Sequence, residues 1–179
     1  MANLLTAIRL ILVIPVTWGL ADSSIIPGQV LLLLIFVAIA TDYLDGIVAR
    51  ANQTASEKGQ LFDHGTDFLF VTSGLAGCAY AGLINPALPA VIVIAFAQYV
   101  LDSYYLHQQR DLKMSFLGRW NGIFYFAPLM IIACSRLGLG QDVSDVLEYV
   151  TALVAWILLA STILSIFDRA IAPKNRPEP

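Results

Sequence analysis

Charged residues are scarce in this sequence. Of its 179 residues, 13% are charged and 58% are hydrophobic, whereas soluble domains usually carry about 25% charged residues. The mean hydropathy of +0.75 therefore places the chain among membrane proteins. Lys and Arg number 10 against 13 Asp and Glu. The sequence thus lacks the basic surface that binding to nucleic acid requires, and we exclude nucleic acid as a partner.

Cysteine is also rare, and so are the features that divide a chain into domains. Cys78 and Cys134 both lie in apolar segments. Neither has the CxxC spacing or the nearby histidine of a metal or redox site, so we expect small buried side chains. No Pro/Gly/Ser-rich linker, charge block or internal repeat interrupts the sequence. We therefore expect one domain over residues 1–179.

Six apolar segments are long enough, or nearly so, to cross a bilayer as helices. A membrane helix needs about 20 largely apolar residues, and turn-forming or polar residues separate the six segments. We predict spans at 4–21, 28–50, 60–83, 87–107, 116–137 and 147–171. The predicted fold class is an all-α integral membrane protein with six transmembrane helices.

The basic residues predict the orientation of these spans. An even number of spans puts both termini on one side, and cytoplasmic loops carry an excess of Lys and Arg. Arg136 falls at the face opposite the termini. The other basic residues fall at the face that holds the termini: Arg9, Arg50, Lys58, Arg110, Lys113, Arg119, Arg169, Lys174 and Arg176. Both termini are therefore predicted to be cytoplasmic.

Four aspartates lie where an apolar span should not have them. Asp42 and Asp45 are near the end of the second span, and Asp63 and Asp67 are near the start of the third. A charged side chain at the bilayer centre costs roughly 2.5–3.5 kcal/mol on insertion scales. Spacings of three and four residues put each pair on one helix face. Since the connection between the two helices is short, we predict that both pairs converge in a cavity open to the cytoplasmic side.

Carboxylates this close together need compensating positive charge. Sites made only of oxygen ligands suit Mg²⁺, Mn²⁺ or Ca²⁺, and a metal pair can polarise a pyrophosphate during displacement at phosphorus. Gly46, Ala49 and Gly59 leave room for a nucleotide beside the helix backbones, and the planar fork of Arg50 suits a phosphate. Solvated helix ends would explain one such aspartate, but not four at these spacings. The pattern predicts a nucleotide diphosphate substrate.

These residues resemble the signature of the CDP-alcohol phosphotransferase family, D-x2-D-G-x2-A-R-x8-G-x3-D-x3-D. Every defined position and gap is matched, by Asp42, Asp45, Gly46, Ala49, Arg50, Gly59, Asp63 and Asp67. Asn3, Thr6 and Arg9 also resemble the N-x2-T-x2-R that often begins the first helix of these enzymes. The motif covers residues 42–67, and the six predicted spans extend the resemblance over nearly the whole chain.

The resemblance implies a metal-dependent transferase that releases CMP from a CDP-linked lipid or alcohol. Two Mg²⁺ or Mn²⁺ ions would be held by Asp42, Asp45, Asp63 and Asp67, and Asp67 would also act as the general base. The cytidine diphosphate would be held by Gly46, Ala49, Arg50 and Gly59, with Thr6 touching it from the first helix. The resemblance also implies a homodimer. We expect the protein to be embedded in a bacterial or archaeal inner membrane, in contact with membrane lipids.

The acceptor alcohol is left open by the sequence. Family members that use a phosphorylated acceptor resemble one another in a basic residue directly after the last aspartate of the motif, where this chain has Phe68. Members that use glycerol 3-phosphate also tend to have a G-K-x-K-T stretch on the fifth span. Here this stretch keeps one basic residue, Arg119. A dianionic phosphate needs several cationic donors, so both departures weaken the interpretation as a phosphatidylglycerophosphate synthase, which is kept as an alternative. We favour CDP-diacylglycerol with a small polar alcohol. The candidate acceptor-pocket residues are Arg119, Asn121, Asp102 and His64.

Two other interpretations are kept open. The stretch 61–67 resembles the L-F-D-H-G-x-D of choline and ethanolamine phosphotransferases, which transfer a CDP-linked head group to diacylglycerol. An ion-conducting transporter is the alternative that is not an enzyme, because carboxylates inside a membrane also mark ion pathways. Transporters usually show internal repeats and broken helices near the midplane, and the sequence shows no such repeat.

Overall fold

The computed structural model describes residues 2–51, 57–101 and 116–171. Over these ranges the chain is helical and contains no strand. The helices are α1 (Ala2–Ala21), α2 (Gly28–Ala51), α3 (Glu57–Tyr80), α4 (Ala87–Leu101), α5 (Phe116–Phe124), α6 (Phe126–Ser135) and α7 (Gln141–Ile171). The all-α prediction is confirmed for this part of the chain. The first three helices lie within three residues of their predicted ends, and residues 102–107 of the predicted fourth span lie outside the described ranges.

The predicted span 116–137 is divided into two helices at Tyr125. Pro128 stands in the first turn of α6 and has no N–H to donate to the carbonyl of Phe124, so the regular bonding of a continuous helix fails there. The predicted start of the last helix at 147 was wrong, since α7 begins at Gln141. Its polar first turns favour a helix start: the Gln141 amide donates to the Asp145 carboxylate at 3.0 Å.

Within the described ranges, two stretches are long and apolar enough to cross a membrane, judged by length and composition. They are Leu117–Ser135, which joins α5 and α6, and Gln141–Ile171. Three shorter helices are also apolar, Leu5–Ala21, Gly28–Leu44 and Ala87–Leu101. The prediction of six spans and of cytoplasmic termini goes beyond these observations and stays a prediction.

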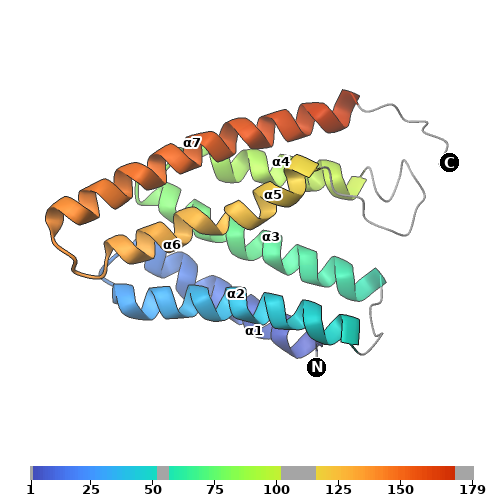
Figure 1. Ribbon diagram of the computed structural model, residues 1–179, viewed down its shortest axis with the longest axis horizontal. Coiled ribbons are helices and arrows are strands. Elements are labelled where there is room, and N and C mark those ends of the chain that lie inside the picture. Colours follow the sequence, from blue (N-terminus) through green and yellow to red (C-terminus); the bar gives the residue numbers. More distant parts are fainter. Residues whose placement is uncertain (1, 52–56, 102–115, 172–179) are drawn as a thin grey trace.

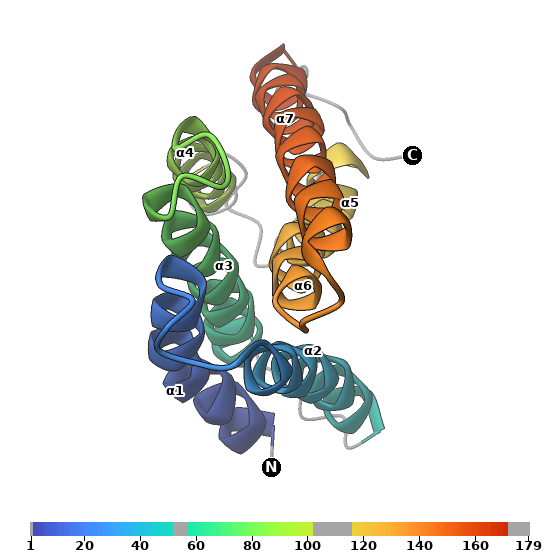
Figure 2. The ribbon, with the colours of Figure 1, turned by 90° about the vertical axis from the view of Figure 1, so that its left-hand side faces the viewer.

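The helices close into a ring. In Figure 2, which looks along the bundle, each helix packs on the next in the order α1, α3, α4, α7, α6, α2, and α2 returns to α1. The core between them is fully buried and aliphatic, as at Leu20, Leu31, Leu75 and Leu129. Because α5 and α6 run in the same direction and the other successive helices alternate in direction, the start of α1 and the end of α7 lie at the same end of the bundle (Figure 1).

The opposite end of the bundle is closed by Arg136, which follows α6. Its guanidinium donates to the carbonyl oxygens of Gly19 and Leu20, the second at 3.0 Å. These carbonyls belong to the last turn of α1 and have no partner within their own helix. Arg136 therefore ties α6 to α1 through hydrogen bonds that the end of a helix needs.

The closest packing of α1 against α3 depends on Gly77. A Cβ atom built at Gly77 would lie 2.5 Å from the backbone carbonyl oxygen of Thr17 and 3.4 Å from the Cβ of Leu20. A backbone atom cannot move aside as the end of a side chain can. Gly77 thus sets how near α1 comes to α3, the helix that carries Asp63 and Asp67.

We predict that Gly77→Ala destabilises the protein by about 2 kcal/mol, because the new methyl group overpacks the contact between α1 and α3. The measurement is the midpoint of thermal unfolding in detergent. Gly65→Ala on the same helix is the matched control, since a Cβ there meets nothing within 4 Å and alanine favours helix. Equal midpoints for the two variants would show that α1 and α3 are not held at this distance by Gly77.

Candidate active site

Three carboxyl groups meet around one arginine at the end of the bundle where α2 ends and α3 begins. Nη2 of Arg9 on α1 lies 3.2 Å from Oδ1 of Asp42 on α2. Nη1 of Arg9 lies 3.2 Å from Oδ1 of Asp63 and also pairs with Oδ1 of Asp67, both on α3. The convergence predicted for the second and third helices is therefore observed for three of the four aspartates.

Arg9 lies behind the carboxylates and is closed off from solvent. Its side chain is 0% exposed, whereas the side chains of Asp42, Asp63 and Asp67 are 40%, 28% and 25% exposed. The carboxylates thus have one side on Arg9 and another side open. A further cation can reach them from the open side.

The donor groups of this cluster fit a divalent metal. Ligand atoms of Asp63, His64 and Asp67 all lie within 4.8 Å of one another. Asp63 and His64 are four and three positions before Asp67, and residues at these spacings are neighbours on a helix. Asp42 shares the guanidinium of Arg9 with the two aspartates of α3, so its carboxylate belongs to the same cluster. Carboxylate oxygens are the ligands that Mg²⁺ prefers, and Mn²⁺ accepts them as well.

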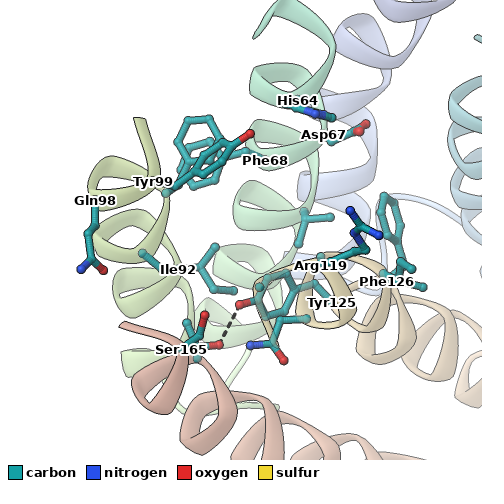
Figure 3. Close-up of a pocket in the computed structure, with 18 of the residues that line it drawn as sticks. His64, Asp67, Phe68, Ile92, Gln98, Tyr99, Arg119, Tyr125, Phe126 and Ser165 are labelled. Atoms are coloured by element: carbon teal, nitrogen blue, oxygen red, sulfur yellow. Dashed lines mark hydrogen bonds between the residues drawn. The ribbon is translucent and has the colours of Figure 1, made fainter. Parts of the chain in front are cut away.

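A cavity of about 490 Å³ opens beside the cluster. Asp42, His64 and Asp67 line it on one side. Figure 3 shows Tyr99 of α4, Arg119 of α5 and Ser165 of α7 on the other sides. The volume is within the range of cavities that bind small molecules. A molecule in this cavity would lie against Asp67.

Aromatic side chains form one wall of the cavity. Phe68 of α3 stacks on Phe96 of α4 with ring centroids 4.0 Å apart. Phe96 in turn contacts Tyr99 at 6.0 Å between centroids. The guanidinium carbon of Arg169 on α7 lies 5.1 Å from the centroid of the Tyr99 ring, a cation–π contact. This wall is apolar, with a cation at its edge.

Some polar atoms of residues that line the cavity have hydrogen-bonding capacity to spare. Asn121 is 4% exposed, and its Oδ1 accepts from the Ser161 hydroxyl at 2.7 Å. The amide nitrogen of Asn121 and the hydroxyl of Tyr99 are buried without a hydrogen-bond partner among the described residues. Tyr125, by contrast, shares a 2.7 Å hydrogen bond with Thr162. Unpaired buried polar atoms are rare, so these two are suited to a bound molecule.

The structure brings together most of the predicted site residues that it describes. Asp42, His64, Asp67, Arg119 and Asn121 line one cavity, and Asp63 joins them through Arg9. Thr6 is buried on α1, three residues before Arg9. The remaining residues are placed only in part: Asp45, Gly46, Ala49 and Arg50 in α2 and Gly59 in α3, their side chains not described, and Asp102 outside the described residues.

Sequence reasoning missed the parts played by Arg9, Tyr99 and Arg169. Arg9 and Arg169 entered it as charges that orient the spans, and Arg9 also as part of the resemblance in the first helix. A signal for Arg9 was present, because a charge inside an apolar helix is costly and usually has a partner. Tyr99 and Arg169 gave no such signal, since their contact joins α4 to α7.

These features define a helical protein with a carboxylate cluster beside a cavity for a small molecule. Residues 1–166 match the family model described as CDP-alcohol phosphatidyltransferase. The chain belongs to the CDP-alcohol phosphatidyltransferase family. Members of this family are membrane-bound transferases that use CDP-alcohol substrates and typically depend on metal ions. Among curated proteins, no relative matches this chain.

We predict that Tyr99→Phe raises the KM for the substrate that occupies the cavity about tenfold without lowering stability. Among the described residues the hydroxyl has no hydrogen-bond partner, so its removal breaks no bond to them, and the ring can keep its contacts. Tyr125→Phe is the matched comparison: it loses the bond to Thr162 and should cost about 1 kcal/mol of stability with a smaller change in KM. Steady-state kinetics and thermal unfolding of both variants test this. An unchanged KM in Tyr99→Phe contradicts it.

Proposed function

We propose that this protein makes a phospholipid by displacing CMP from CDP-diacylglycerol with the hydroxyl group of a small polar alcohol. The observation that carries the proposal is the shared cavity: Asp67 lines it together with polar groups of Tyr99 and Asn121. A carboxylate of the family motif therefore lies where an acceptor hydroxyl would bind. Family membership supports the transfer from a CDP-alcohol.

In the proposed reaction, the Asp67 carboxylate takes the proton of the acceptor hydroxyl. The hydroxyl oxygen then bonds to the phosphorus that carries the diacylglycerol, and the bond from this phosphorus to the bridging oxygen breaks, so that CMP leaves with that oxygen. Divalent cations held by Asp42, Asp45, Asp63 and Asp67 would supply positive charge to the pyrophosphate. The proposed contacts of the cytidine diphosphate are Gly46, Ala49, Arg50, Gly59 and Thr6.

The cavity supports an uncharged alcohol as the first candidate acceptor. Phe68, the residue after Asp67, stacks on Phe96 and presents a ring where a phosphate would need a cation. The Tyr99 hydroxyl and the Asn121 amide provide the neutral hydrogen-bonding groups that hydroxyl groups of an alcohol can use. His64 and Arg119, which line the same cavity, are also part of the proposed acceptor pocket.

A phosphorylated acceptor is the second candidate, and one observation favours it. Arg169 lines the cavity together with Arg119. The cavity therefore has two guanidinium groups, whereas the motif of the predicted fifth span retains a single basic residue. Arginine binds phosphate through paired N–H donors. The acceptor panel described below separates the two candidates.

The membrane arrangement and the assembly are part of the same proposal. Six spans with both termini in the cytoplasm agree with the start of α1 and the end of α7 lying at one end of the bundle (Figure 1). In this arrangement the cavity faces the cytoplasm. A homodimer in a bacterial or archaeal inner membrane remains our expectation from the family.

We predict that the purified protein releases CMP from CDP-diacylglycerol when Mg²⁺ or Mn²⁺ and the correct alcohol are present. A panel of glycerol, serine, inositol, glycerol 3-phosphate and inositol phosphate identifies the acceptor, with CMP and the lipid product measured together. CDP-choline or CDP-ethanolamine with diacylglycerol tests the opposite direction of transfer. If none of these mixtures consumes a cytidine nucleotide, the proposed function is wrong.

We predict that Asp67→Asn lowers kcat at least a hundredfold, because an amide cannot take the proton of the acceptor, while binding of CDP-diacylglycerol stays measurable. Asp42→Asn should instead weaken Mn²⁺ binding at least tenfold. Asp145→Asn is the control, since Asp145 is exposed at the start of α7, at the other end of the bundle. Kinetics and Mn²⁺ titration of the three variants provide the measurements. Full activity of Asp67→Asn and Asp42→Asn would refute the assignment of the site.

A further inference from the structure

Arg9 has contacts that a buried arginine seldom makes. Its guanidinium is planar and offers paired N–H groups that match the two oxygens of one carboxylate. Here Nη1 is shared between Asp63 and Asp67, and Nη2 faces Asp42. The remaining donor, Nε, is buried without a hydrogen-bond partner among the described residues. The guanidinium thus lies at the centre of three carboxylates without pairing fully with any of them.

A metal ion bound by the same three carboxylates would favour the position that the Arg9 guanidinium occupies. A divalent cation and a guanidinium repel each other, most strongly where water is scarce. Both are attracted to Asp42, Asp63 and Asp67. The contacts of Arg9 and the binding of a metal therefore oppose each other at these oxygens, even though the carboxylates are partly open on their other side.

We propose that Arg9 is a positioning residue that competes with the divalent cations for the carboxylates of Asp42, Asp63 and Asp67. This inference rests on the proposed function, in which these aspartates hold the metal. Arg9 keeps the carboxylates together by charge, and metal binding displaces it from at least one of them. Since two ligands that compete lower each other's affinity by the same factor, Arg9 makes the metal site weaker and the protein without metal more stable.

The test is the affinity of the purified full-length protein for Mn²⁺ in detergent, measured by titration calorimetry or electron paramagnetic resonance without any substrate. Arg9→Met removes the charge and keeps much of the volume. We expect it to bind Mn²⁺ at least tenfold more tightly than the wild type. Its thermal midpoint without metal should fall, and the rise of the midpoint with Mn²⁺ should exceed that of the wild type.

Two further variants separate charge from shape. Arg9→Gln is neutral but can still donate to a carboxylate, so it should also bind Mn²⁺ at least tenfold more tightly, and it carries the test if Arg9→Met does not fold. Arg9→Lys keeps the positive charge and should return the affinity to within about threefold of the wild type.

Arg136→Met is the matched control. Arg136 is a partly buried arginine that donates instead to the carbonyl groups of Gly19 and Leu20, at the other end of the bundle. Its replacement should lower the thermal midpoint with and without Mn²⁺ by the same amount and leave the Mn²⁺ affinity unchanged. A residue with only a structural role behaves in this way.

The outcomes are distinct. If the wild type binds Mn²⁺ and the neutral Arg9 variants bind it equally well or more weakly, the competition proposed for Arg9 is refuted, while the proposed function stands. If the wild type does not bind Mn²⁺ at all, the metal chemistry of the proposed function fails and the role of Arg9 fails with it. The proposal is supported if both neutral variants bind Mn²⁺ more tightly than the wild type and Arg9→Lys has nearly the affinity of the wild type.

Discussion

The ion pairs of Arg9 join three helices at the end of the bundle where α2 ends and α3 begins. Arg9 is on α1, Asp42 is on α2, and Asp63 and Asp67 are on α3. Taking these groups out of water is costly, and a buried ion pair often returns little net stability. Such an arrangement is a poor way to make a stable bundle and a good way to hold carboxylates at a site. The packing of α1 on α3 at Gly77 then serves to keep Arg9 within reach of its partners.

The two sides of the helix ring contribute different parts of the site. The helices α1, α2 and α3 bring the charged groups together, and α4, α5 and α7 supply most of the remaining cavity wall. The two sides meet within α3, where Asp67 faces the cluster and its neighbour Phe68 packs against Phe96 of α4. One helix therefore fixes both the carboxylate and the wall beside it, so a substrate against Phe68 is already close to Asp67.

What could be predicted from the sequence is what depends on short distances along the chain. The spacing of Asp63 and Asp67 places them on one helix face wherever the helix lies, and the short connection between α2 and α3 brings Asp42 near. The break at Tyr125 was not predicted, although Pro128 carries its cause. The contact of Tyr99 with Arg169 depends on how α4 packs against α7, and no pattern within either helix specifies that packing.

Arg9 also changes the electrostatic argument for a metal. The sequence predicted divalent cations as the compensating charge for the clustered aspartates. Arg9 supplies one positive charge that this prediction did not count. A single guanidinium can offset only one of three carboxylates. The charge still to be balanced among Asp42, Asp63 and Asp67 is the amount that one divalent cation carries, and Asp45 on the same helix as Asp42 adds to it. The carboxylates therefore still carry enough negative charge to bind a divalent cation. That cation must bind against the repulsion of Arg9.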